Sequence, residues 1–194
     1  MTKKQAYMIH SVPFTAVLDT NIIYPVIIRD LLFWFAHYDL FTPKWSKHIF
    51  DEWKDVMVRK GVDIKEAEKR VQKANMAFPD ALVKNYTELI QMLNLPDEKD
   101  CHVLAAAIKT NADIIVTNNL KDFPQEYLDS FGLKAKNADD FLSEIITLNP
   151  EKSIAAFREM ALNKRNPVMT EYEILNSLRK AGLLNTASYL DALL

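Results

Sequence analysis

Cysteine and glycine are scarce in this chain, whose 194 residues include one cysteine and three glycines. A single cysteine cannot form an internal disulfide, which excludes a disulfide-stabilised scaffold. With so few glycines the sequence has no glycine-rich phosphate loop, so the Walker and dinucleotide-binding classes have no support. Internal repeats and low-complexity tracts are also absent. The composition therefore describes an ordinary folded protein whose chemistry must come from other residue types.

The chain also lacks a hydrophobic run long enough to cross a bilayer. Its most apolar stretch, residues 22–35, contains Arg29 and Asp30 and falls short of the ~20 residues that a membrane-spanning helix needs. The polar start, Met1 to Gln5, leads into no hydrophobic segment of a secretory signal, so we expect a cytoplasmic protein with no membrane association. The net charge of −2 gives no overall attraction to nucleic acid, so such binding would need local basic patches or bound cations.

Short apolar runs alternate with helical patterns through most of the chain. Buried strands are expected at residues 14–18 and 113–117, and weaker strands at 40–42, ended by Pro43, and 133–135. Helices are expected between them, over residues 26–37, 46–60, 64–77, 81–93, 96–111 and 137–148. Strands that alternate with helices predict a three-layer α/β/α fold with a central parallel sheet.

The end of the chain contains helical patterns alone. Thr170 and Glu173 form a T-x-x-E capping box, and Gly182 is typical of a helix end. We therefore expect residues 14–148 to form the α/β domain and residues 149–194 to form a C-terminal helical appendage.

Polar side chains follow the two clearest expected strands. Asp19 and Asn21 follow the first strand, and Asn118 and Asn119 follow the second. Ligands of open parallel sheets bind beyond the carboxyl ends of the strands, so these residues are candidates for a site. The alternative for Asp19 and its neighbours is a turn that caps the following helix, a common role for these residue types.

Two acids interrupt apolar faces of the expected helices. Glu52 shares a helical stripe with Trp45, and Asp100 lies one turn before Val103. A desolvated carboxylate is costly unless it is paired or binds a metal, which makes both acids candidate ligands. The alternative is that they lie at the margin of the core and meet solvent or a lysine. For Asp97, stabilisation of a helix dipole is at least as good an explanation.

Asp19, Glu52 and Asp100 come from distant parts of the sequence. If they converge without basic partners, their charges would raise one another's pKa until a hard divalent cation neutralised them. Ligands that are oxygen atoms only favour Mg²⁺ or Mn²⁺. Such a cluster suits the hydrolysis of phosphodiesters, in which one or two ions activate water and offset charge on the reacting oxygens.

Four segments resemble the motifs of PIN-domain ribonucleases. They read A-V-L-D-T-N at 16–21, S-K-H-I-F-D-E-W at 46–53, D-E-K-D-C-H-V-L-A-A-A at 97–107 and A-D-I-I-V-T-N-N-L-K-D-F-P at 112–124. Their order and spacing match across about residues 14–148, and the four together are far more specific than any one. Within this family the chain resembles the VapC-type toxins of bacterial toxin–antitoxin pairs, particularly the subgroup with a helical extension after the PIN core.

The resemblance implies a role for each matching position. Asp19, Glu52 and Asp100 would be the acidic metal ligands, Asn21 would hydrogen-bond beside the first acid, and Thr117 would orient the site. The implied activity is metal-dependent endoribonuclease cleavage of RNA by activated water, leaving a 5′-phosphate and a 3′-hydroxyl. The implied partners are an antitoxin protein and a second copy of the chain in a homodimer.

The chain departs from the family pattern at the fourth acid. Many PIN domains have an aspartate two residues after the strand-end threonine, where this chain has Asn119. An amide cannot supply the missing charge, so either the Asn119 carbonyl oxygen or the carboxylate of Asp122 would complete the site. The departure keeps open a catalytically silent RNA-binding module, beside a PIN-type nuclease of RNA processing or structured DNA without an antitoxin.

Lysines are scattered close to these motifs. Lys47 and Lys121 lie near the proposed mouth of the site and are candidates for binding the RNA backbone, whose phosphates position a strand without specifying its sequence. The alternative is a solvated face, which is the usual role of scattered lysines.

Overall fold

Residues 14–194 are described by the structure, a computed structural model, so the expectation for Met1 to Gln5 lies outside the described range. The strands are β1 (Thr15–Leu18), β2 (Thr42–Ser46), β3 (Leu82–Val83), β4 (Ile114–Val116) and β5 (Lys134–Lys136). They form one sheet in the order β3-β2-β1-β4-β5, and every neighbouring pair is parallel. The predicted parallel sheet is confirmed.

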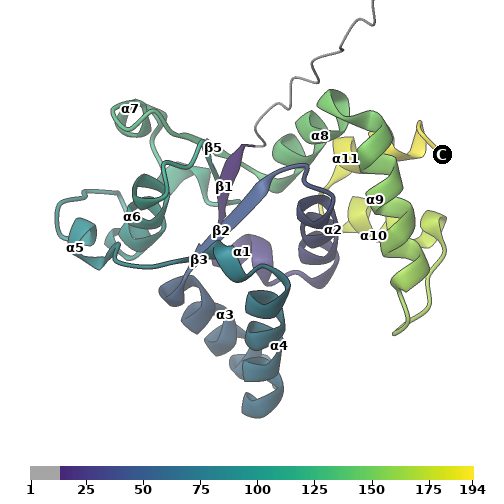
Figure 1. The fold of residues 1–194 in the computed structure, drawn as a ribbon, viewed down its shortest axis with the longest axis horizontal. Coiled ribbons are helices and arrows are strands. Elements are labelled where there is room, and N and C mark those ends of the chain that lie inside the picture. The colour runs from purple at the N-terminus through teal and green to yellow at the C-terminus, as the bar shows by residue number, and fades with distance from the viewer. Residues whose placement is uncertain (1–13) are drawn as a thin grey trace, which may run out of the picture.

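The helices surround this sheet. They are α1 (Thr20–Ile23), α2 (Val26–His37), α3 (Lys47–Arg59), α4 (Ile64–Ala77), α5 (Thr87–Ile90), α6 (Cys101–Lys109), α7 (Gln125–Asp129), α8 (Ala138–Leu148), α9 (Pro150–Asn163), α10 (Glu171–Lys180) and α11 (Leu184–Asp191). Helix α6 packs on β1, β2 and β4, and Figure 1 shows it on the opposite side of the sheet from α2 and α8. The expected three-layer α/β/α arrangement is therefore confirmed. No helix within the described part of the chain has both the length and the apolar surface to cross a bilayer.

Burial and capping explain why the central elements form. Ala16, Val17 and Leu18 of β1 are fully buried, as expected for a parallel strand that is covered on both faces. The Ser46 hydroxyl accepts a hydrogen bond of 3.2 Å from the backbone N–H of Ile49 and so begins α3.

The predicted strand at residues 40–42, ended by Pro43, was wrong. The observed strand β2 covers Thr42–Ser46, so Pro43 lies within it. The backbone N–H of Thr42 donates to the backbone carbonyl of Phe14, on the side of β2 that faces β1. Alternate residues of a strand face its two neighbours, so Pro43 faces β3, which pairs only with Trp45 and Ser46. The missing N–H of proline therefore costs no hydrogen bond there.

Two further differences follow from this placement of β2. Trp45 is in the strand and not in α3, so the predicted helical stripe that joined it to Glu52 was wrong. The predicted helix over residues 81–93 was also wrong, because Leu82 and Val83 form the edge strand β3. A helical pattern in the sequence is overridden here by pairing with β2, and only the short helix α5 follows.

The last three helices pack on the α/β core through α2 and α8. Helix α9 packs against α2, and α11 packs against α8, as Figure 1 shows on the right of the sheet. The Asp139 carboxylate of α8 accepts hydrogen bonds from the backbone N–H groups of Asn185 (3.0 Å) and Thr186 (2.8 Å), at the start of α11. On its other face α8 packs Phe141 against Phe41, with ring centroids 5.0 Å apart. The expected boundary at residue 148 stays a prediction.

Candidate active site

Asp19 lies at the carboxyl end of β1, next to the end of β4. One carboxylate oxygen accepts a hydrogen bond from the backbone N–H of Thr20 at 2.6 Å and caps α1. The other accepts from the Thr117 hydroxyl at 2.7 Å and from the Asn21 amide at 2.5 Å. Burial raises the pKa of Asp19 above its ordinary value, although the hydrogen bonds from Thr117 and Thr20 oppose the shift. The capping role and the site role therefore coexist in one carboxylate.

Asn21 and Thr117 tie the ends of β1 and β4 together. The Asn21 amide also donates to the Thr117 hydroxyl at 3.1 Å, and its carbonyl oxygen accepts from the backbone N–H of Asn118 at 2.9 Å. The Thr117 hydroxyl accepts a further hydrogen bond of 3.1 Å from the backbone N–H of Asn119. These contacts fix the position of Asp19 and of the turn after β4.

Glu52 reaches the same edge of the sheet from α3. One of its oxygens accepts from the Thr20 hydroxyl at 2.6 Å, and the other lies 3.0 Å from Nε2 of His102. Burial raises the pKa of Glu52, but the hydrogen bonds from His102 and Thr20 outweigh it and the net shift is downward. Glu52 therefore already has partners that favour its charged form.

The side chains of His102, His48 and Tyr86 form a row that leads from Glu52 toward the edge strand β3. The ring centroids of His102 and His48 are 5.3 Å apart, and Nδ1 of His48 lies 2.5 Å from the Tyr86 hydroxyl. Nδ1 of His102 is buried and has no hydrogen-bond partner among residues 14–194. The sequence did not predict this arrangement, because Tyr86 fell within the mistaken helix and neither histidine belongs to a recognisable spacing pattern. A signal was present only in the polar character of His102 on an otherwise apolar helix.

Asp100 and Asp122 meet across the amide of Asn119. Asp100 ends the 3₁₀ turn Glu98–Asp100 and Asp122 ends the turn Leu120–Asp122. The Asn119 amide donates to Asp100 at 3.2 Å and also to Asp122. Asn119, which stands where many PIN domains have an aspartate, therefore lies between two other acids.

Negative charge is concentrated around Asp100. Burial, together with the charges of Asp19, Asp97 and Asp122, raises the pKa of Asp100 to about 6. Neither Asp19 nor Asp100 forms an ion pair with a lysine or arginine in the part of the chain described. Asp97 also caps its own turn, since its side chain accepts from the backbone N–H of Lys99 at 3.0 Å.

The donor set fits a hard divalent cation by its chemistry, because it consists of carboxylate and amide oxygens and two of its carboxylates, Asp19 and Asp100, have no cationic partner among the described residues. Within residues 14–194, no three His, Cys, Asp or Glu side chains are arranged to hold one metal ion. The reason is visible in the contacts: Glu52 faces Thr20 and His102, whereas Asp100 and Asp122 face Asn119. Which acids would bind an ion therefore stays a prediction.

Of the two candidate RNA-binding lysines, Lys121 contacts this network and Lys47 does not. Lys47 pairs with Asp51 on α3 at 2.5 Å. Lys121 has a side chain that is 81% exposed and lies 4.0 Å from Asp122. Lys121 therefore contacts one of the candidate acids, and both lysine side chains are exposed to solvent.

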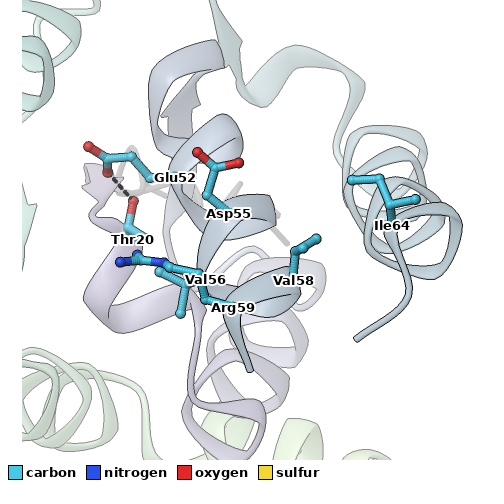
Figure 2. Close-up of a pocket in the computed structure, with 7 residues that line it drawn as sticks. All are labelled: Thr20, Glu52, Asp55, Val56, Val58, Arg59 and Ile64. Atoms are coloured by element: carbon cyan, nitrogen blue, oxygen red, sulfur yellow. Dashed lines mark hydrogen bonds between the residues drawn. The ribbon is translucent and has the colours of Figure 1, made fainter. Parts of the chain in front are cut away.

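A cleft of about 740 Å³ opens beside the acids, between α3 and α4. Its lining residues are drawn in Figure 2 and include two members of the site, Thr20 and Glu52. Asp55 and Arg59 continue the same face of α3. The cleft extends the site away from the sheet.

The parallel sheet and the acids at its carboxyl edge define an α/β protein of the PIN-domain class. The PIN domain family matches residues 15–121, which is more than half of the chain, and the chain belongs to this family. Residues 138–192 match a second family, the VapC50 C-terminal domain. The resemblance to VapC-type PIN proteins with a C-terminal extension is thus confirmed.

One similar protein also has VapC50 in its name. The protein named "Putative ribonuclease VapC50" of Mycobacterium tuberculosis (strain ATCC 25618 / H37Rv) is 38% identical over 98 residues, which cover 50% of this chain and 57% of the relative. The match therefore spans less than two thirds of that protein. No solved structure was found to match the chain.

Proposed function

We propose that this protein is a divalent-metal-dependent endoribonuclease. The observation that carries the proposal is that the Asn119 amide joins Asp100 to Asp122 while Thr117 links Asn119 to Asp19, and the charges of these acids help to raise the pKa of Asp100 to about 6. Carboxylates that repel one another lower the stability of the folded state unless a cation offsets their charge. Strongly shifted pKa values of this kind cluster at functional sites. The name of the curated relative, a ribonuclease, supports RNA as the substrate class.

In this proposal Asp19, Asp100 and Glu52 hold Mg²⁺ or Mn²⁺. Asp122 supplies the fourth negative charge, because Asn119 stands where many PIN domains have an aspartate. Asp122 would hydrogen-bond to a water molecule on the ion and would not contact the ion directly. The bound ion would activate water and offset charge on the reacting phosphodiester, which is cut to a 5′-phosphate and a 3′-hydroxyl.

The other residues of the site hold these acids in place. Thr117 and Asn21 fix the position of Asp19 through hydrogen bonds to one of its oxygens, and the bond from Thr117 partly offsets the rise in its pKa that burial causes. Asn119 keeps Asp100 and Asp122 together against their mutual repulsion. Their contribution is to preorganise the negative charge, so that little rearrangement is needed when substrate binds.

The biological role that we infer is that of the toxin in a toxin–antitoxin pair. The match of residues 138–192 to the VapC50 C-terminal domain supports it, since the extension belongs to the VapC-type subgroup. The expected partners are RNA, an antitoxin protein and a second copy of the chain in a homodimer, all in the cytoplasm. Lys47 and Lys121 would contact the RNA backbone on the way to the acids.

The test is an RNA cleavage assay with and without Mn²⁺, Mg²⁺ and a chelator. We expect cleavage that the chelator abolishes, and we expect Asp19→Asn and Asp100→Asn to remain folded but inactive because each removes charge that holds the cation. Asp80→Asn is the matched control, since Asp80 is exposed and its side chain takes part in none of the hydrogen bonds or ion pairs described for the site. Wild-type turnover in either site variant would refute the assignment.

Two alternatives have distinct outcomes in the same experiments. A catalytically silent RNA-binding module, which the asparagine at position 119 favours, would bind RNA with no turnover in any metal. An RNA-processing or structured-DNA nuclease would cleave nucleic acid but cause no growth arrest that a co-encoded small protein relieves.

A further inference from the structure

Four side chains spaced at about one turn of helix form one face of α3. Glu52, Asp55, Val56 and Arg59 lie at positions i, i+3, i+4 and i+7, which are neighbours on a helix surface. This face forms one wall of the 740 Å³ cleft, and Ile64 at the start of α4 closes the other side. A cavity of this size lies within the range of ~300–1,000 Å³ that is usual for small-ligand sites.

Arg59 is a cation without a partner beside the acids. Its guanidinium forms no hydrogen bond or ion pair with any side chain of residues 14–194, although Asp55 stands at the favourable i−4 position. Figure 2 shows the guanidinium turned toward the Thr20 end of the cleft and the Asp55 carboxylate turned away from it. Both charged groups are therefore free to bind something else.

The two ends of the cleft have different chemistry. Arg59 extends toward the end where Thr20 and Glu52 meet, which is the end next to the candidate active site. At the other end, Val58 and Ile64 expose 39% and 45% of their surface, which is a large fraction for apolar side chains. A molecule that suits both ends has an anionic group for Arg59, an apolar surface for Val58 and Ile64, and N–H groups for Asp55.

We propose that this cleft binds the nucleotide of single-stranded RNA that flanks the scissile phosphate, with a preference for guanine. This rests on the proposed function. Arg59 donates to the phosphate, because its planar fork of N–H groups matches two phosphate oxygens. The base lies against Val58 and Ile64, and Asp55 accepts from its Watson–Crick edge.

Guanine is favoured because of what Asp55 can accept. A carboxylate has two oxygens side by side, and guanine is the base whose N1–H and N2–H groups donate in parallel to such a pair. The other bases offer a single donor group on that edge, so each would leave one carboxylate oxygen without a base partner. The cleft thus supplies sequence selection, whereas the acids at the sheet edge are indifferent to the base.

The binding test compares Arg59→Gln with Lys60→Gln, since Lys60 is the neighbouring exposed cation and does not line the cleft. Binding to a short fluorescent single-stranded RNA is measured by anisotropy in chelator, so that no cleavage occurs. We expect Arg59→Gln to weaken binding about tenfold and to reduce the salt slope by about one. Lys60→Gln should change both quantities much less. Equal effects of the two substitutions would overturn the subsite.

The selectivity test uses four RNAs that differ only in the base next to the mapped cut site. We expect wild-type protein in Mn²⁺ to have the highest kcat/KM for guanine, and Asp55→Asn to lose that preference while it still cleaves. Asp80→Asn is the control and should keep the preference. Cleavage by the wild type without any base preference, or a preference that survives Asp55→Asn, would overturn the proposal for the cleft while leaving the ribonuclease intact. Absence of cleavage by the wild type would instead overturn the proposed function.

Discussion

Replacing Asp100 by asparagine is expected to abolish activity and yet to stabilise the protein when no metal is present. The pKa of Asp100 is raised from 3.8 to about 6 by burial and by the charges of Asp19, Asp97 and Asp122. The folded state therefore binds a proton more tightly than the unfolded state, so stability falls as the pH rises from about 4 to 6. Above pH 6 Asp100 is ionised and its destabilising effect on the folded state reaches its maximum. Below pH 4 the carboxyl is protonated and this destabilisation disappears.

The size of the effect follows from the shift. Two pKa units correspond to ~3 kcal/mol, and since Asp100 is partly exposed, solvent screening reduces this to about 1 kcal/mol. For a protein of this length such a gain raises the Tm by roughly 2–4 °C. Asparagine can still accept the hydrogen bond from Asn119, so that contact is kept.

Thermal melts at two pH values and two metal conditions test this reasoning. With chelator at pH 7.5, Asp100→Asn should melt above the wild type, and the difference should disappear at pH 4. With Mn²⁺ at about 100 times its Kd, the wild type should gain ~2.7 kcal/mol and become the more stable of the two. Asp80→Asn should follow the wild type throughout. If Asp100→Asn melts below the wild type in chelator at pH 7.5, the crowding of charge on which the site rests is wrong.

Five other substitutions test three separate parts of the structure. Asp122→Asn should raise the Mn²⁺ concentration for half-maximal cleavage more than Asn119→Ala does, because only Asp122 carries charge; an unchanged metal titration with a lower melting temperature would make Asp122 structural. His102→Ala should lower kcat by about 10- to 100-fold with little change in RNA affinity, and His102→Gln, whose amide can donate to Glu52, should recover part of the loss; equal kcat for both variants would show that the hydrogen bond is unimportant. Asp139→Ala should lower the free energy of unfolding by ~1–2 kcal/mol in denaturant titrations, since two N–H groups at the start of α11 lose their acceptor; an unchanged value would refute that role.

The sheet and much of the candidate site could be predicted because they depend on local patterns. Asp19 and Thr117 follow buried apolar strands, and the carboxyl ends of neighbouring parallel strands must meet at one edge. Glu52 and Asp100 were predicted from helical patterns that the structure only partly reproduces, since Trp45 lies in β2 and Asp100 ends the 3₁₀ turn before α6. Proximity of these four groups then follows from the topology of the fold.

Contacts between distant segments could not be predicted in the same way. The strand β3 consists of two residues, too short for any alternation of polar and apolar side chains to appear. Its pairing with β2 brings Tyr86 to His48, 38 residues earlier in the chain. Likewise, nothing in the sequence indicates that Arg59 turns away from Asp55, because at this spacing the two usually pair.

Helix α8 has a consequence for how the protein unfolds. It contacts the core through Phe141 and holds α11 through Asp139, so neither neighbour can be lost without exposing one of its faces to water. The chain should therefore unfold in one cooperative transition, with the sheet and the last helices melting together. Any event that loosens α11 should then also disturb Asn137, which caps α8 directly after β5 and lines one pocket together with Asn118, the residue that follows Thr117.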